Sequence, residues 1–246
     1  MRPLGDGGPR VSPIGLGTVK IGRNTLVKYP QPFDLPSDED VVALIDAARH
    51  LGINLIDTAP AYGTSESRLG ELLTDRENWL LCSKVGETGP GEFDFSPAGA
   101  RRSVEGSLRR LRTDYLDLLL IHSDGNDEAI LSSPLVQTLT DLRTEGLVRQ
   151  VGASTKTVRG GLMAVDALDV VMVALNPDDV SQLPVVEAAG AAGKGILVKK
   201  ALASGHAADM AGSLAFVLGK PIVSSVVVGT LNPQHLAENV AAARGF

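Results

Sequence analysis

The chain has few of the residues that mark specialised classes of protein. Its single cysteine, Cys82, excludes an intramolecular disulfide and a metal site built from several cysteines. Because Cys82 lies in the apolar run Trp79–Cys82, we expect a small buried residue rather than a reactive thiol. No apolar run approaches the roughly 20 residues that span a bilayer, and the N-terminus lacks the apolar segment of a secretory signal. We therefore expect a cytoplasmic protein with no membrane partner.

Basic charge and aromatic side chains are also scarce. The chain has 23 Lys and Arg against 29 Asp and Glu, a net charge of -6. This balance argues against a nucleic-acid partner, because phosphate binding requires a basic field. Aromatic residues make up only 4%, so the core must consist mainly of Leu, Val, Ile and Ala, and the 43% of hydrophobic residues provide enough for one large core. We expect a single domain over residues 1–246 and make no prediction of the oligomeric state.

Apolar runs of strand length alternate with segments of helical periodicity along almost the whole chain. The expected strands are Ile14–Gly17, Ile53–Asp57, Trp79–Lys84, Tyr115–His122, Val148–Ser154, Val170–Asn176, Ile196–Lys200 and Val223–Gly229. The expected helices are Asp38–Leu51, Ser65–Leu73, Ser96–Leu111, Leu135–Glu145, Val158–Asp166, Val180–Ala189, Asp209–Leu218 and Pro233–Ala243. Strands apolar on both faces are typical of a parallel sheet. Eight alternating pairs predict an α/β fold, a closed (β/α)8 TIM barrel.

The connections between these elements are expected to be short, apart from the loop Arg23–Pro36, which we expect to cross the barrel mouth. The alternation alone also allows an open doubly wound sheet. In Gly15–Lys20, however, lysine stands where the third glycine of a dinucleotide-binding fingerprint would be. The closed barrel is therefore the preferred prediction.

Polar residues follow the expected strands at their carboxyl ends. They are Asp57, Lys84, His122, Ser154, Asn176, Lys199-Lys200 and Gly229-Thr230. Active sites of such barrels form at the carboxyl ends of the strands, because the loops there converge on one mouth. Seven polar strand ends in succession therefore indicate a functional site.

The residue types at these ends favour acid–base chemistry on a carbonyl group. Tyr62, in the loop after Asp57, is expected near Lys84, whose ammonium would lower the pKa of the phenol and would itself be held by Asp57. His122 can donate a hydrogen bond to an oxygen that becomes negative. No nucleophile or metal cage accompanies these four residues. The set suits protonation of an alkoxide formed by hydride addition.

At these residues the sequence resembles the aldo-keto reductase family over nearly its whole length. The resemblance rests on the stretch Gly52–Gly63 and on Ser65-Glu66, Leu69-Gly70, Ser83-Lys84, Asp117–His122, Gly152–Ser154, Gly229-Thr230 and Glu238-Asn239. It implies an NAD(P)H-dependent oxidoreductase that reduces aldehydes or ketones, with Tyr62 as general acid, His122 orienting the carbonyl and the Asp57–Lys84 pair tuning Tyr62.

The resemblance also implies a cofactor extended across the barrel mouth and a small-molecule carbonyl substrate. The residues expected to bind the cofactor are Gly17, Thr18, Asp57, Ser154, Thr155, Met172, Lys199, Lys200, Leu202, Ser204, Gly229, Thr230, His235, Glu238 and Asn239. Ser154 would contact the nicotinamide amide, and Lys200, Leu202 and Ser204 would contact the pyrophosphate. The adenosine end would be bound by Thr230, His235, Glu238 and Asn239.

Several positions depart from the family pattern. Thr155 stands where asparagine is usual, Met172 where glutamine is usual, and Lys199 at a position that is often aromatic. Because side chains alternate along a strand, Lys199 should lie on the opposite strand face from Lys200. Its side chain is then expected either to contact the cofactor or to reach solvent. Gly229 and His235 replace two cations that hold the 2′-phosphate in NADPH-specific relatives, so NADPH follows from family habit and NADH stays open. The chain ends soon after the last expected helix, without a long C-terminal tail, which predicts an open, unselective site.

Two other functions are consistent with the sequence. The altered nicotinamide-side residues are compatible with a redox-sensing or regulatory protein that binds cofactor but turns over negligibly. A Schiff-base lyase using Lys84 or Lys200 is the third hypothesis. Multiple turnover on carbonyl compounds separates the first alternative from the reductase, and borohydride trapping of a lysine adduct identifies the second.

Overall fold

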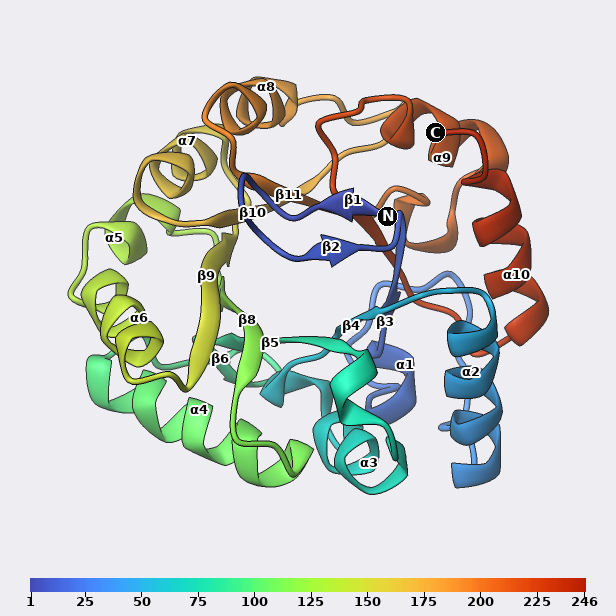
Figure 1. Cartoon of the computed structure of the whole chain (residues 1–246), viewed down its shortest axis with the longest axis horizontal. Coiled ribbons are helices and arrows are strands. Elements are labelled where there is room, and N and C mark those ends of the chain that lie inside the picture. The colour runs from blue at the N-terminus through green and yellow to red at the C-terminus, as the bar shows by residue number, and fades with distance from the viewer.

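The computed structural model describes residues 1–246 and contains a closed barrel of eight parallel strands. In barrel order these are β3 (Ile14–Gly17), β4 (Leu55–Asp57), β5 (Leu80–Val85), β8 (Leu116–His122), β9 (Val148–Ser154), β10 (Val170–Ala174), β11 (Gly195–Lys199) and β12 (Ser225–Val228). Strand β12 pairs with β3 and closes the ring. The predicted (β/α)8 barrel is confirmed (Figure 1).

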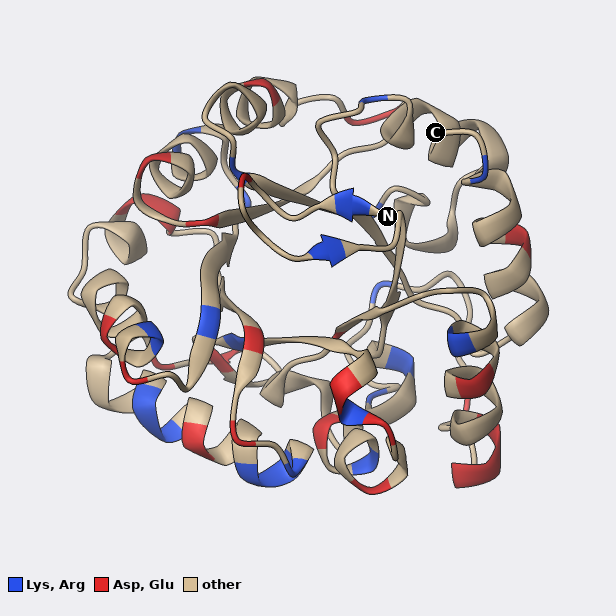
Figure 2. Ribbon diagram, in the orientation of Figure 1, with Lys and Arg blue, Asp and Glu red and all other residues tan.

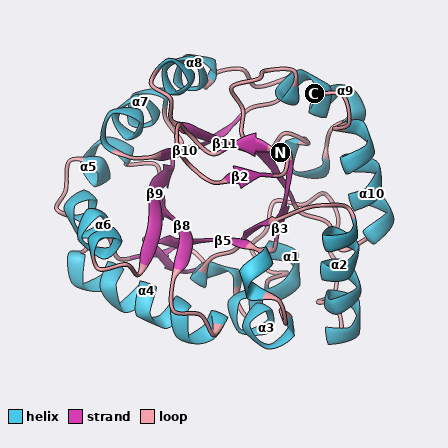
Figure 3. Ribbon diagram, viewed as in Figure 1, coloured by secondary structure: helices cyan, strands magenta, loops and turns pink.

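Helices surround the ring of strands on the outside (Figure 3). One follows each barrel strand: α2 (Asp38–His50), α3 (Ser65–Leu72), α4 (Pro97–Leu111), α6 (Leu135–Thr144), α7 (Val158–Ala167), α8 (Leu183–Ala191), α9 (Met210–Leu218) and α10 (Pro233–Ala242). A capping box formed by Ser37 and Asp40 begins α2. Helix α8 begins three residues later than predicted, because the Asn176 side chain accepts hydrogen bonds from the backbone N–H groups of Asp178 and Asp179 and holds a turn there.

Two apolar layers explain why the strands are hydrophobic on both faces. A large cluster of 47 buried residues fills the space between strands and helices. A smaller cluster joins side chains of the strands inside the ring to two residues of an N-terminal hairpin: Leu4, Val11, Leu55, Cys82, Leu118, Leu120, Val170, Met172 and Leu197. Cys82 is thus the buried residue that the sequence predicts.

The N-terminal hairpin covers the amino-terminal end of the barrel. Its strands are β1 (Arg2–Pro3) and β2 (Arg10–Val11), and they lie across the ring in Figure 1. The Asp6 N–H donates to the Gly193 carbonyl at the start of β11, and Gln150 on β9 donates to the Leu4 carbonyl. With this end closed, the opposite end is free for a site.

Short additional helices and strands lie at the carboxyl end of the barrel. They make its mouth less open than the short loops expected from the sequence would. They are α1 (Val19–Gly22), η1 (Pro60–Tyr62), the ribbon β6 (Glu87–Gly89) with β7 (Glu92–Phe93), α5 (Asp127–Leu131) and η3 (Ala203–Gly205), besides η2 (Arg76–Asn78) at the other end. The loop Arg23–Pro36 follows α1 and contributes six residues to the cavity at the mouth. No helix in the structure is both long enough and apolar enough to span a bilayer.

Candidate active site

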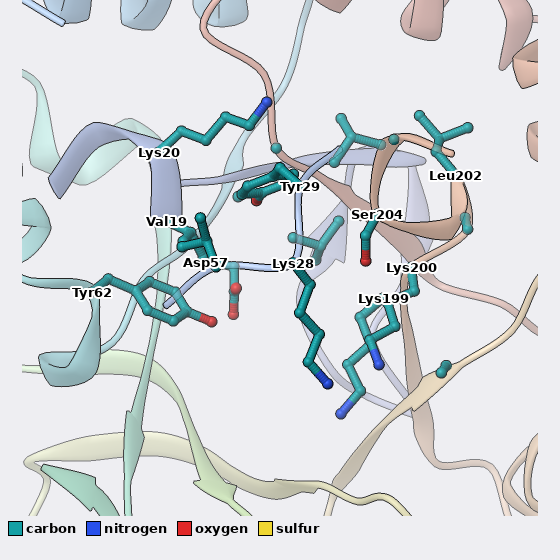
Figure 4. Close-up of a pocket in the computed structure, with 18 of the residues that line it drawn as sticks. Val19, Lys20, Lys28, Tyr29, Asp57, Tyr62, Lys199, Lys200, Leu202 and Ser204 are labelled. Atoms are coloured by element: carbon teal, nitrogen blue, oxygen red, sulfur yellow. The ribbon is translucent and has the colours of Figure 1, made fainter. Parts of the chain in front are cut away.

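A cavity of about 720 Å³ opens at the carboxyl ends of the barrel strands. This volume lies within the roughly 300–1,000 Å³ typical of small-molecule and cofactor sites. Residues from β3, β4, β8, β11 and β12 line it together with the loop over the mouth. Figure 4 shows Tyr62 and Asp57 on one side of the cavity and Lys28 and Lys199 on the other. Five of the polar strand-end residues line this cavity, namely Asp57, His122, Lys199, Lys200 and Gly229, whereas Lys84, Ser154, Asn176 and Thr230 lie outside its lining.

A buried ion pair lies at the base of the cavity. Lys84 at the end of β5 donates to Asp57 Oδ1 on β4 over 2.6 Å and to the Thr58 carbonyl over 2.8 Å. Both residues are almost completely buried. Burial alone would lower the pKa of Lys84, but the Asp57 carboxylate raises it above its usual value, so the ammonium stays charged.

Tyr62 lies beside this ammonium. The η1 turn carries its ring into the cavity wall, and the Lys84 Nζ is 4.7 Å from the ring centroid. Lys84 lowers the pKa of the phenol, as the sequence predicts. Burial has the larger effect, however, and the pKa of Tyr62 is above its usual value of 10.0. The expected net lowering was therefore wrong, and Tyr62 stays protonated at neutral pH.

His122 ends β8 and faces Tyr62 edge-on, with ring centroids 6.1 Å apart. Its Nδ1 lies 2.9 Å from Glu87 Oε2 on β6. Arg23 lies 3.6 Å from the other oxygen of Glu87. Burial lowers the pKa of His122, and its contact with Glu87 only partly offsets this effect. Neutral imidazole is therefore the main form at pH 7.

Lys199 turns toward the cavity and not to solvent. Its Nζ donates to Ser154 Oγ over 2.7 Å and to the Thr155 carbonyl over 3.0 Å. The solvent-facing alternative left open from strand alternation was wrong, because β11 ends here, and Ser154 at the end of β9 and Thr155 just after it offer two acceptors on the far side of β10. Burial, reinforced by Lys200 and Lys84, lowers the pKa of Lys199 to about 7.

The segment after β11 has a strained backbone. Lys200, Ala203 and Ser204 all have positive φ, at 58°, 47° and 59°. Non-glycine residues in this region are uncommon and tend to cluster at ligand sites. Lys200 and Ser204 both line the cavity.

The predicted cofactor residues divide into two groups. Those that line the cavity are Gly17, Asp57, Thr155, Lys199, Lys200, Leu202, Ser204 and Gly229. Those outside its lining are Thr18, Ser154, Met172, Thr230, His235, Glu238 and Asn239. Among the second group, the Thr18 hydroxyl donates to the Asp57 carbonyl and Met172 packs inside the barrel. His235 and Glu238 belong to α10, further around the rim.

Sequence reasoning missed Glu87 and Arg23, which surround His122 from outside the barrel strands. A signal for Glu87 existed in Gly86, which has a φ of 109°, and an added Cβ there would lie 2.4 Å from the Phe95 ring. Only glycine allows the chain to turn from β5 into β6 so closely against Phe95. No comparable signal marks Arg23, which reaches the site from the start of a loop.

The cavity is rich in cations although the chain as a whole is acidic. Its basic residues are Lys20, Arg23, Lys28, Lys156, Lys199 and Lys200, and its acidic residues are Asp57, Glu87 and Asp179. Thr155 Oγ1 and Gln182 Oε1, both in the cavity wall, are buried without a hydrogen-bond partner. A ligand with negative groups and hydrogen-bonding amides fits this set of side chains.

Two solved structures with similar folds are described as aldo-keto reductases. A crystal structure of PA4992, assigned to the aldo-keto reductases, from Pseudomonas aeruginosa is 54% identical, with a TM-score of 0.90, and the match covers 98% of this chain and 93% of that one. The aldo-keto reductase AKR11C1 from Bacillus halodurans, at 22% identity, has the same fold, with a TM-score of 0.84 over 100% of this chain and 91% of that one.

Curated relatives are oxidoreductases. L-galactose dehydrogenase from Arabidopsis thaliana is 35% identical over 160 residues, which are 62% of this chain and 47% of that protein. The chain thus spans about half the length of that relative. The family model described as "Aldo/keto reductase family" matches residues 13–211, most of the barrel. The chain therefore belongs to the aldo/keto reductase family of oxidoreductases.

Proposed function

We propose that this chain reduces the carbonyl group of a small aldehyde or ketone to an alcohol with NAD(P)H. One observation carries the proposal: Tyr62, His122 and Asp57 line the same cavity, and the Lys84 ammonium lies against both Asp57 and Tyr62. A protonated phenol beside a fixed ammonium is suited to give a proton to an oxygen that becomes negative.

The cavity wall supports a nicotinamide dinucleotide as the cofactor. Members of the family generally use nicotinamide cofactors, and the ammonium groups of Lys28, Lys156 and Lys200 provide the positive field that a pyrophosphate requires. The unpartnered oxygens of Thr155 and Gln182 can accept hydrogen bonds from a carboxamide. We propose NADPH ahead of NADH, since the cavity has cations to spare for a third phosphate.

In the proposed reaction each side chain has one task. The bound cofactor supplies a hydride to the carbonyl carbon. Tyr62 donates its phenolic proton to the carbonyl oxygen, and Lys84 stabilises the phenolate that remains. His122 orients that oxygen from the opposite side of the cavity. Asp57 keeps the Lys84 ammonium in place, and the closed amino-terminal end of the barrel keeps solvent out from below.

The substrate class rests on the names of relatives. They include a D-arabinose 1-dehydrogenase from Saccharomyces cerevisiae, 34% identical over 58% of this chain and 43% of that protein, and a methylglyoxal reductase from Salmonella typhimurium, 30% identical over 49% and 45%. A small polar carbonyl compound is consistent with both, and with a cavity lined by many polar side chains.

Replacement of Tyr62 tests this function. We expect Tyr62→Phe to lower the turnover of a reactive aldehyde by roughly 10²–10⁴-fold, the usual contribution of a general acid, with little change in the dissociation constant of NADPH. Tyr115→Phe is the matched control, because Tyr115 lies outside the cavity, between Arg76 and Arg149. Wild-type turnover in Tyr62→Phe would show that another group is the acid.

The same assays bear on the two alternatives. Tight cofactor binding without multiple turnover over a broad carbonyl panel would favour a regulatory protein. The Schiff-base reaction loses support at Lys84, because its raised pKa and its bonds to Asp57 and Thr58 leave no free amine. Borohydride trapping remains the direct test of Lys200.

A further inference from the structure

Glu87 is the acidic side chain in contact with His122, and it takes no part in the proposed reaction. Its Oε2 lies 2.9 Å from Nδ1, in an orientation that does not form a regular hydrogen bond, and Nδ1 is buried without a hydrogen-bond partner. The other ring nitrogen, Nε2, makes no hydrogen bond within the protein, and His122 lines the cavity. The two nitrogens of His122 therefore meet different surroundings, carboxylate on one side and cavity on the other.

Glu87 is held firmly enough to control a proton. Arg23 lies 3.6 Å from Glu87 Oε1, and the backbone N–H of Gly91 donates to the same oxygen over 3.4 Å. Arg23 is itself anchored, since its guanidinium donates to the carbonyls of Ala61, Thr25 and Leu26. Burial would raise the pKa of Glu87, but His122, Gly91 and Arg23 lower it below its usual value. The group facing Nδ1 is a carboxylate at neutral pH.

We propose that Glu87 is a positioning residue that keeps a proton on His122 Nδ1 and so leaves Nε2 of the neutral ring as a hydrogen-bond acceptor toward the cavity. At 2.9 Å, a carboxylate opposite a bare Nδ1 would place two lone pairs against each other, whereas a proton on Nδ1 is attracted to the negative oxygen. The other tautomer is therefore disfavoured.

This tautomer determines which ligands His122 can hydrogen-bond, an inference that rests on the proposed function. Neutral His122 accepts a hydrogen bond from the hydroxyl of an alcohol ligand. Only the imidazolium, with a proton on each nitrogen, donates to a carbonyl oxygen while it stays paired with Glu87. Carbonyl compounds then bind best to the protonated ring, and alcohols to the neutral ring.

The charges around His122 determine the pH at which the change occurs. Glu87 on β6 favours the imidazolium, and Arg23 behind it weakens that effect. Lys84 on β5 and Lys199 on β11 both disfavour the imidazolium, and the uncharged ring of Tyr62 on η1 lies edge-on. Without Glu87, the largest remaining influences on His122, which are its burial and the ammonium groups of Lys84 and Lys199, all oppose the imidazolium. Removal of the carboxylate must therefore lower the pKa of His122.

The tautomer can be read directly by nuclear magnetic resonance. The full-length protein, labelled with ¹⁵N-histidine, gives separate signals for protonated and bare ring nitrogens, and His122→Asn identifies which signals belong to His122. At pH 7.5 we expect a proton on Nδ1 and a bare Nε2 in the wild type. Glu87→Leu should lose this preference, and Glu92→Leu, on the neighbouring strand β7 of the same ribbon, should keep it.

A wild-type spectrum with a bare Nδ1, or an unchanged tautomer in Glu87→Leu, would overturn the proposal. If Glu87→Leu does not fold, the wild-type spectrum still decides. The spectrum does not depend on turnover. A protein that reduced no carbonyl compound would therefore contradict the proposed function without contradicting the proposed tautomer.

The link to catalysis is tested with Glu87→Gln. In this variant the pH profile of carbonyl reduction should shift to lower pH, with a loss of activity of roughly tenfold at pH 7, as removal of one charge partner commonly causes. An unshifted profile would remove the link to catalysis.

Discussion

At the scale of single residues, burial and charge act against each other at the barrel mouth. The Lys84 ammonium stays charged because Asp57 outweighs its burial. Tyr62 stays protonated because burial outweighs the effect of Lys84. Lys199 has hydroxyl and carbonyl partners but no carboxylate, so burial prevails and its pKa falls to about 7. Neighbouring groups of similar chemistry thus reach different protonation states at the same pH.

Lys199 should leave a measurable trace in stability. Its pKa is lower in the folded protein than in the unfolded chain, where a lysine has its usual pKa of 10.5. Between these two values the unfolded chain binds more protons, so the stability of the wild type rises with pH relative to Lys199→Met. We expect the difference in melting temperature, wild type minus variant, to increase by a few degrees between pH 7 and pH 9.

Thermal unfolding of both proteins across this pH range checks the prediction, and the difference cancels the effects of other groups. Lys220→Met, on a lysine that lies against the Phe216 ring and away from the cavity, is the control and should show no such trend. A difference that stays constant with pH would mean that Lys199 remains charged throughout.

At the scale of elements, Arg68 on α3 connects the two ends of the loop over the mouth. Its guanidinium donates to the Ile21 carbonyl before the loop and to the carbonyl of Pro36, the last residue of the loop, and it pairs with Asp38. Between these anchors the loop carries Lys28 and Tyr29 into the cavity wall. One arginine therefore holds a segment that has little regular structure of its own.

We expect Arg68→Met to increase amide hydrogen exchange in residues 23–36 by about tenfold or more, which corresponds to about 1.4 kcal/mol of lost anchoring. Exchange in the barrel strands should stay unchanged. Arg112→Met, which breaks only the exposed pair with Glu71, should leave the loop as it is. Unchanged exchange in the loop of Arg68→Met would show that packing alone holds it.

At the scale of the whole molecule, charge is divided between the outside and the mouth. Acidic and basic residues are both spread over the surrounding helices (Figure 2), and the net charge is -6, whereas the cavity gathers six basic residues against three acidic ones. A concave site focuses the field of its own charges, so the mouth attracts anions although the molecule as a whole repels them.

Salt should therefore weaken binding of the proposed cofactor. We expect the dissociation constant of NADPH to rise several-fold between 0.05 M and 0.5 M sodium chloride, because screening becomes shorter than the width of the mouth over roughly this range. Lys28→Gln should reduce the dependence on salt, and Lys194→Gln, which lies outside the cavity, should not. Fluorescence titration at several salt concentrations measures both. Affinity independent of salt would argue against a phosphate-bearing ligand.

The sequence by itself determined the barrel and the four residues at its mouth. Alternating apolar strands and amphipathic helices can bury both strand faces in only a few arrangements. A polar residue at the carboxyl end of a buried barrel strand then lies near the mouth, where the loops converge. The tertiary structure alone decided which charges meet. Glu87 reaches His122 because Gly86 turns the chain against Phe95, and Lys199 turns inward because Ser154 and Thr155, at the end of β9, offer two acceptors. Protonation states depend on such contacts between distant segments, and no local pattern in the chain records them.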